Sequence, residues 1–281
     1  MKKKLPPIVF FGNEKLATGV ASSSIIVDSL RNAGWEIEQV VTGPPSELRQ
    51  HEAKLAVLAA YGHIVPQSVL DAFPLGIVNI HPSLLPLYRG STPIEQALLD
   101  GVEKTGVSIM RLDRAMDEGP LYKQQSLKIN AYETKQSLTN RLHQLGADLL
   151  ISTLPLIATS ALKARKQPHP NRATYTKRIQ KIDGRINWDL PAEVIEKQIR
   201  AYAGWPRSRA TLENIDVIIT QAEVIDASGI AGKLRGGDGL IVHCGKASLR
   251  IRRIIPAGKK EMTDQEFLRG YKARLKLSCA G

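Results

Sequence analysis

Residues 77–90 read IVNIHPSLLPLYRG, which is the densest cluster of chemically informative residues in the chain. Its apolar start, Ile77 to Ile80, predicts a buried strand. Asn79 and His81 are two residues apart, so their side chains share one face of that strand. Polar side chains at the carboxyl end of a strand are typical of ligand sites in open α/β sheets. The sequence therefore predicts a ligand site immediately after this strand.

Segments with strand and helix patterns alternate on both sides of this stretch. The predicted strands are 8–12, 37–41, 55–60, 77–80, 107–112 and 121–129, and the predicted helices are 22–33, 92–101 and 133–162. Pro155 should kink or divide the last helix. This order predicts an α/β fold with a doubly wound, mostly parallel Rossmann-like sheet.

The pattern changes in the second half of the chain. Residues 163–178 lack periodicity and contain two prolines, which predicts a linker between a domain at 1–162 and a domain at 179–281. A helix is expected after Pro191, and a capping box at Thr263 predicts a second helix. Short strands separated by glycine turns, at 209–212, 217–225, 240–243 and 248–254, predict a small β-barrel or sandwich.

The net charge of +12 is confined to the second half. Residues 1–161 contain 15 Lys and Arg against 15 Asp and Glu, whereas residues 162–281 contain 24 against 12. A basic solubilising surface is one explanation, and a module that binds a polyanion is the other. The candidate RNA contacts are Arg89, Arg207, Arg209, Arg250 and Arg252.

A carboxylate is expected beside Asn79 and His81. Asp117 lies in a loop after another predicted strand and could reach the same rim of the sheet. Amide and imidazole N–H groups stabilise a developing oxyanion, and a carboxylate orients the imidazole and helps to move protons. The set predicts an acyl-transfer site without a covalent nucleophile. Ser83 lacks the glycine-flanked elbow of a nucleophilic serine, and its hydroxyl is expected to brace the loop.

Several classes of protein are excluded by missing motifs. Neither a dinucleotide-binding glycine motif nor a triphosphate-binding loop occurs, and the histidines and cysteines lack metal-ligand spacing. Cys244 and Cys279 cannot supply a disulfide framework. The missing metal-ligand spacing predicts that no metal is bound. No apolar run is long enough to span a membrane, so we expect a cytoplasmic protein with no membrane partner.

The stretch Asn79 to Pro86, with Asp117 thirty-six positions after His81, resembles the signature of the folate-dependent formyltransferases. The resemblance implies that Asn79, His81 and Asp117 are catalytic and pass a formyl group from 10-formyltetrahydrofolate to an amine. It also implies a folate site made by His63, Ile64, Val65, Ser83, Leu84, Leu85 and Pro86.

Further stretches resemble the branch of this family that formylates initiator methionyl-tRNA. They are residues 10–12, 60–66, 181–188 and 267–271. The resemblance implies an OB-like second domain that helps to hold the tRNA, with initiator methionyl-tRNA and folate as partners of a monomer. Only 13 residues, Thr42 to Lys54, connect the second and third strands, where this branch usually carries a longer segment that enters the acceptor arm. Pro82 is a smaller departure, because Ala is commoner there in this branch.

Two alternatives remain open. A sugar-nucleotide N-formyltransferase shares the chemistry of the first domain and commonly lacks the tRNA loop, which the short Thr42–Lys54 segment favours. The basic second domain opposes it. A nonenzymatic RNA-binding protein that keeps an old catalytic domain as a scaffold is the other alternative, and the intact Asn79, His81 and Asp117 set opposes that one.

Overall fold

The computed structural model describes residues 5–13, 24–236, 239–275 and 277–278. The chain forms two compact units. The first contains Met1–Ile94, Val102–Asn130 and Ser137–Lys177, and the second contains Glu95–Gly101, Ala131–Gln136 and Arg178–Gly281. Residues 163–177, predicted as most of the linker, thus lie in the first unit, where Arg165 pairs with Leu121 and Tyr175 with Arg89.

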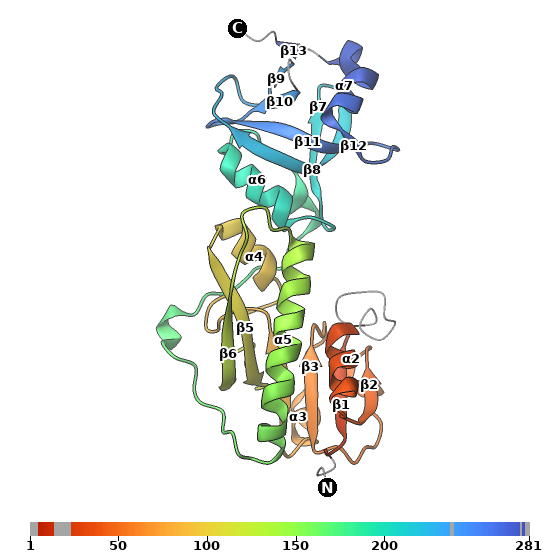
Figure 1. The fold of residues 1–281 in the computed structure, drawn as a ribbon, viewed down its shortest axis with the longest axis vertical. Coiled ribbons are helices and arrows are strands. Elements are labelled where there is room, and N and C mark those ends of the chain that lie inside the picture. The colour runs from red at the N-terminus through yellow and green to blue at the C-terminus, as the bar shows by residue number, and fades with distance from the viewer. Residues whose placement is uncertain (1–4, 14–23, 237–238, 276, 279–281) are drawn as a thin grey trace. The chain divides into compact units, whose positions relative to one another are not determined.

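The first unit is built on a six-stranded sheet with the order β2-β1-β3-β4-β5-β6 (Figure 1). Its strands are β1 (Ile8–Gly12), β2 (Ile37–Val41), β3 (Leu55–Ala59), β4 (Ile77–His81), β5 (Lys104–Arg111) and β6 (Leu121–Lys128). The first four are parallel, and β5 and β6 extend the sheet as antiparallel neighbours. β1, β3 and β4 are buried along their whole length, which explains their continuous apolar runs. The predicted mostly parallel α/β sheet is confirmed.

The helices of this half of the chain are α2 (Ser24–Asn32), α3 (Gln67–Asp71), α4 (Pro93–Asp100) and α5 (Lys135–Ala158). α5 runs through Pro155, where the sequence predicts a kink or a break, and ends at Ala158. Pro155 lies in the last turn of α5. The backbone hydrogen bond that it removes is therefore close to the end of the helix, and most of the helix is unaffected.

α5 packs closely against one face of the sheet. A Cβ atom at Gly146 of α5 would lie only 2.9 Å from Cγ2 of Ile80, the residue between Asn79 and His81 on β4. Side chains alternate between the two faces of a strand. Contact of Ile80 with α5 therefore directs Asn79 and His81 to the opposite face of the sheet.

The short connection between β2 and β3 is closely hydrogen-bonded. It contains a 3-10 turn at Pro45–Glu47. The Gln39 side chain donates to Glu47 O (2.9 Å) and accepts from the backbone N–H of Arg49 (3.1 Å), and the Tyr61 hydroxyl donates to Gly43 O (2.7 Å). The 13-residue segment is thus held by hydrogen bonds to Gln39 of β2 and to Tyr61, which follows β3.

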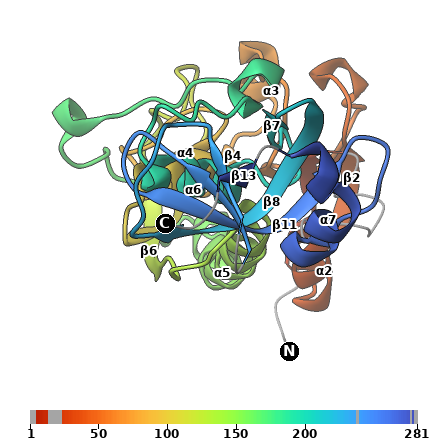
Figure 2. The ribbon, with the colours of Figure 1, turned by 90° about the horizontal axis from the view of Figure 1, so that it is seen from above.

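The second unit contains a curled, mainly antiparallel half-barrel with the strand order β13-β9-β10-β11-β8-β7, and β12 pairs with β11. Its strands are β7 (Ser208–Leu212), β8 (Ile215–Ile225), β9 (Leu234–Arg235), β10 (Leu240–His243), β11 (Ser248–Pro256), β12 (Met262–Thr263) and β13 (Leu277–Ser278). Helix α6 (Ala192–Ala201) packs on β8, and α7 (Asp264–Tyr271) lies beside β11 (Figure 2). The predicted small β-barrel domain is confirmed.

The core of the second unit is apolar and includes Phe267 of α7, which is fully buried and stacks on Tyr271 at a ring-centroid distance of 4.7 Å. The predicted capping box at Thr263 forms, because the Thr263 hydroxyl accepts from Glu266 N–H and the Glu266 carboxylate accepts from Thr263 N–H. Cys244 lies in the same core, and burial raises the pKa of its thiol to about 11. Cys279 lies outside the described residues. None of the helices in the described ranges is long and apolar enough to cross a membrane.

Phe267→Ala should lower the free energy of unfolding of the second unit by about 3–5 kcal/mol, because it leaves a cavity in a closed core. Urea unfolding of the full chain measures this loss. Ile230→Ala is the matched control: Ile230 lies in the same unit but is 73% exposed, so its truncation should change the free energy by about 0.5 kcal/mol or less. An unchanged unfolding midpoint for Phe267→Ala would contradict this core.

Candidate active site

Asn79 and His81 lie at the carboxyl end of β4, on the face opposite α5. They are almost completely buried, with 6% and 4% of their surface exposed. His81 is paired with Ser108 of β5 across the sheet. The Asn79 carboxamide makes no hydrogen bond to any other residue in the described part of the chain. A buried amide without a protein partner is available to a ligand.

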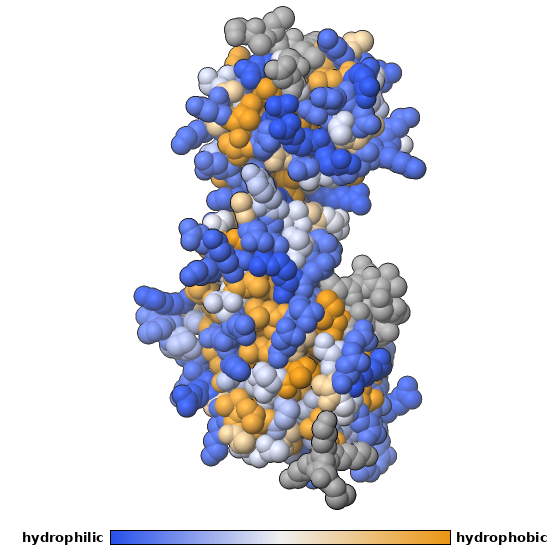
Figure 3. Space-filling model, viewed as in Figure 1, coloured by the Kyte–Doolittle hydropathy of each residue, from blue (hydrophilic) through white to orange (hydrophobic). Residues whose placement is uncertain are grey.

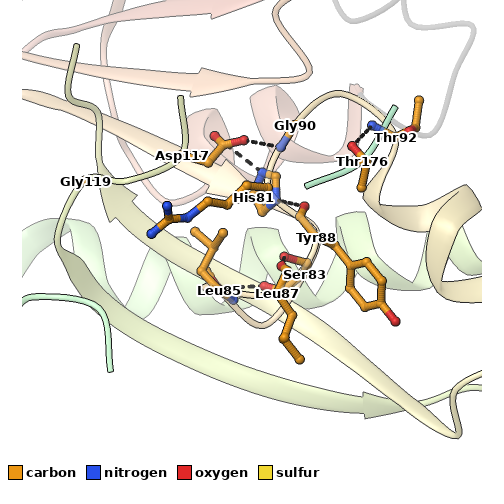
Figure 4. A network of polar contacts seen from close by, with 12 residues as sticks. His81, Ser83, Leu85, Leu87, Tyr88, Gly90, Thr92, Asp117, Gly119 and Thr176 are labelled. Atoms are coloured by element: carbon orange, nitrogen blue, oxygen red, sulfur yellow. Dashed lines mark hydrogen bonds and ion pairs between the residues drawn. The ribbon is translucent and has the colours of Figure 1, made fainter. Parts of the chain in front are cut away.

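The imidazole of His81 lies between a main-chain carbonyl and a carboxylate (Figure 4). Nε2 is 3.0 Å from Tyr88 O, and because a carbonyl oxygen only accepts, Nε2 carries the proton of this bond. Nδ1 is 3.7 Å from Oδ1 of Asp117, which is beyond hydrogen-bond distance. Nδ1 is therefore the ring nitrogen that remains free to exchange a proton.

Asp117 is held in the loop between β5 and β6. Its backbone adopts the left-handed conformation (φ 53°), and its Oδ2 accepts a hydrogen bond from Gly90 N–H at 2.7 Å. Gly119 lets this loop lie against the end of β5, since a Cβ atom there would be 1.9 Å from Arg111 O. The structure thus brings Asn79, His81 and Asp117, which are distant in sequence, to one rim of the sheet.

Ser108 supports the loop that follows β4. Its buried hydroxyl donates to Ser83 O (2.6 Å) and accepts from Leu85 N–H (3.1 Å) and from the Gln124 amide (2.8 Å). The Ser83 hydroxyl donates to Leu87 O (2.6 Å), within the loop itself. Of the loop residues predicted to bind folate, Ser83, Leu85 and Pro86 are buried and Leu84 is half-buried.

The loop after β3 is open to solvent. His63 is exposed, Ile64 has 87% of its surface exposed and Val65 is half-buried. Within the part of the chain that the structure describes, the N–H and C=O groups of these three residues make no hydrogen bond. This loop offers several unpaired main-chain groups to a polar ligand.

Arg89 is buried, with only 5% of its surface exposed. Its guanidinium bonds to Glu118 (2.9 Å), the Tyr175 hydroxyl (2.8 Å) and Gln167 (2.8 Å). A guanidinium enclosed in this way has no exposed face for a phosphate backbone. Arg89 also does not line the basic groove of the second unit.

A basic groove of about 950 Å³ lies in the second unit. The cations that line it are Lys181, Arg185, Arg207 and Arg209, and Asp216 is the one acidic residue among the described residues of its lining. Arg207 and Arg209 bond to the main-chain carbonyls of Gly204 and Pro206, which leaves their charge unneutralised. The visible face of this unit is largely hydrophilic (Figure 3).

At the groove, the stretch 181–188 lies against the start of β7. Arg185 pairs with Arg209, and a Cβ atom at Gly184 would lie 2.3 Å from Arg207 O, so only glycine allows this approach. Lys181 and Arg185 are absent from the predicted RNA contacts, although the family-like stretch 181–188 contains both.

Two of the predicted RNA contacts lie on β11, outside the groove. Arg252 forms an ion pair with Glu223 (2.5 Å), and Arg250 lies next to Gly239. No group of three His, Cys, Asp or Glu side chains within the described ranges is arranged to hold a metal ion.

Two family models match the chain: formyl transferase over residues 17–154, and formyl transferase, C-terminal domain, over residues 178–272. Among curated proteins, the chain is 41% identical over 227 residues to a methionyl-tRNA formyltransferase of Chloroflexus aurantiacus, which covers 79% of this chain and 73% of the relative. It is 37% identical over 244 residues to a protein of the same name from Nitratidesulfovibrio vulgaris, covering 83% and 74%.

Solved structures share the fold at lower identity. HypX from Aquifex aeolicus in complex with tetrahydrofolic acid matches with a TM-score of 0.74, at 14% identity over 99% of this chain and 49% of that one. Methionyl-tRNA formyltransferase from Clostridium thermocellum matches with 0.60, at 18% identity over 81% and 97%. The sugar 3N-formyl transferase WlaRD matches with 0.67, at 16% identity over 92% and 100%.

Ser108→Ala should lower the free energy of unfolding by about 1–3 kcal/mol, because it leaves buried partners of the Ser108 hydroxyl without a hydrogen bond. Chemical unfolding measures the effect. Ser152→Ala is the control: it removes the hydroxyl of an exposed residue that bonds to a carbonyl of its own helix, and the change should stay within about 0.5 kcal/mol. Equal losses in the two variants would show that Ser108 does not hold the loop.

Proposed function

Because this chain belongs to the formyl transferase family, we propose that it transfers the formyl group of 10-formyltetrahydrofolate to the α-amino group of initiator methionyl-tRNA. The observation that carries this proposal is the meeting of Asn79, His81 and Asp117 at the end of β4, in a chain whose second unit presents an unneutralised basic groove.

Asn79 stabilises the charge that develops in the reaction. The amine of an aminoacyl ester adds to the formyl carbon, and negative charge builds on the formyl oxygen. The buried Asn79 carboxamide, which no described residue engages, donates a hydrogen bond to that oxygen. A donor fixed in place before the reaction needs no reorganisation at the transition state.

His81 and Asp117 handle the proton. Tyr88 O fixes Nε2 of His81, so Nδ1 is the atom that exchanges a proton with the reacting groups. A proton on Nδ1 also makes this nitrogen a donor to the formyl oxygen, and the Asp117 carboxylate, 3.7 Å away, stabilises the charged ring. Asp117 thereby assists removal of the ammonium proton from the attacking amine. The bond between the formyl carbon and N10 of the folate then breaks, and N10 takes up a proton as tetrahydrofolate leaves.

The loop after β3 supports folate binding through its main chain. The pterin ring is a planar set of hydrogen-bond donors and acceptors, and the unpaired N–H and C=O groups of His63, Ile64 and Val65 match that chemistry. Leu84, half-buried in the loop after β4, supplies apolar contact. Ser83, Leu85 and Pro86 shape the site from inside the loop.

The basic groove is the proposed contact for the tRNA backbone. Clustered cations without carboxylate partners release counterions when they neutralise phosphates. Arg207 and Arg209, with Lys181 and Arg185, meet that condition, whereas Arg252 is already paired with Glu223. Arg250 and Arg252 are therefore secondary candidates.

A sugar-nucleotide amine is the second candidate acceptor. The short, hydrogen-bonded segment Thr42–Lys54 favours it, because a longer segment in this position would reach an acceptor arm. The basic groove favours the tRNA. Incubation with 10-formyltetrahydrofolate and either charged initiator tRNA or an amino-sugar nucleotide decides between them, and formylation of the sugar alone would overturn the proposal.

His81→Ala should lower the turnover of tRNA formylation by at least about 10²-fold, because both the N–H donor and the proton carrier are lost. Steady-state kinetics with labelled formyl donor measures it. His169→Ala, an exposed histidine outside the site, is the control and should keep its turnover. Near-normal turnover of His81→Ala would refute this role.

Arg207→Ala combined with Arg209→Ala should raise the KM for the tRNA and leave kcat nearly unchanged. The slope of log affinity against log salt should fall by about 1 for each phosphate contact removed. Titration of tRNA binding between low and moderate salt measures this slope. Lys233→Gln, an exposed cation outside the groove, is the control, and an equal effect of Lys233→Gln would mean that the groove has no special part.

A further inference from the structure

The three residues Tyr88, Arg89 and Gly90 connect the two catalytic side chains through their backbone. Tyr88 O accepts from Nε2 of His81, and Gly90 N–H donates to Oδ2 of Asp117. The orientations of the imidazole and of the carboxylate therefore depend on one short stretch of main chain. Its position decides the 3.7 Å separation between the two groups.

Residues 174–176 hold this stretch in place. Arg89 N–H donates to Thr174 O (2.9 Å), and Thr176 N–H donates to Arg89 O (2.7 Å). The Thr174 hydroxyl also accepts from Tyr88 N–H at 2.8 Å. The segment predicted as a linker thus forms a parallel bridge with the active-site loop.

The Arg89 side chain continues the connection to Asp117. Its Nη1 donates to Glu118, the residue next to Asp117, and its Nη2 donates to Gln167 Oε1. The Gln167 amide then donates to Asp117 O (2.6 Å) and Gly119 O (2.9 Å). One buried glutamine therefore holds both carbonyls that flank Glu118, in a loop where Asp117 adopts the left-handed conformation.

We propose that Arg89 and Gln167 are positioning residues, which hold Asp117 and His81 at their working separation by fixing the Asp117 loop to the main chain of residues 88–90. This inference rests on the proposed function. The guanidinium fork is suited to the task, because it bonds at once to a carboxylate and to an amide oxygen in a fixed geometry. A displacement of about 1 Å in such a site lowers the rate by about 10²-fold.

Gln167→Leu is the sharpest variant, because it removes the bonds to Asp117 O and Gly119 O and leaves the catalytic side chains intact. We expect kcat to fall by about 10- to 100-fold, with the KM values for folate and tRNA within about threefold of wild type. Gln198→Leu is the matched control: Gln198 is equally buried (8% exposed) and bonds to a main-chain carbonyl in the second unit. It should keep the wild-type kcat.

Arg89→Lys separates positioning from RNA binding. Lysine keeps the charge but cannot bridge Glu118 and Gln167 together, so kcat should fall while the KM for tRNA stays constant. A rise in the KM for tRNA with kcat unchanged would assign Arg89 to RNA binding. An unchanged kcat in both Gln167→Leu and Arg89→Lys would overturn the proposal.

A spectroscopic readout makes the inference independent of the acceptor. Long-range ¹H–¹⁵N spectra report the protonation of each imidazole nitrogen, and His81→Asn assigns the signal of His81 among the six histidines. In Gln167→Leu the His81 Nδ1 signal should shift away from its wild-type value, whereas in Gln198→Leu it should not. If wild type formylates no tRNA but the shift appears, the proposed function fails and the positioning role stands. If wild type is active and no shift appears, the positioning role fails.

Discussion

The site depends on the packing of Ile80 against α5. Because Gly146 has no side chain, the helix approaches the sheet closely and Ile80 packs directly against it. Side chains alternate along a strand, so Asn79 and His81 lie on the other face. A one-residue slip of β4 would bury the side chains of Asn79 and His81 under the helix. The buried position of β4, which pairs in parallel with β3 and antiparallel with β5, prevents such a slip, because its register is fixed on both sides.

Buried polar groups and cations are unevenly distributed along the chain. Residues 1–161 contain equal numbers of cations and carboxylates and supply the buried polar groups at one rim of the sheet, whereas residues 162–281 contain the excess of cations. Local carboxylates pair some of these cations, as Glu223 pairs Arg252, and leave the groove cations unpaired. The net charge alone therefore says less about RNA binding than the pairing does.

Much of the fold could be predicted because hydrophobic periodicity and the residues that begin or end helices and strands are local properties of a sequence. The apolar runs of β1, β3 and β4, the capping box at Thr263 and the glycine turns of the second half act within a few residues. Pro155, expected to kink or divide its helix, does not divide it, because a proline in the last turn of a helix removes little. The segment 163–177 lacks periodicity, so its bridge to Arg89 left no pattern to detect.

The sequence pattern identifies Asn79, His81 and Asp117 as candidates for the chemistry, because Asn79 and His81 lie two apart on an apolar strand and Asp117 lies in a loop after another strand. How these side chains are held is visible only in the folded chain. Arg89 looks like any other basic residue in the sequence, yet it is buried against Gln167 and Glu118, 78 and 29 positions away along the chain. Such contacts depend on how the whole chain packs, and no local pattern of residues encodes them.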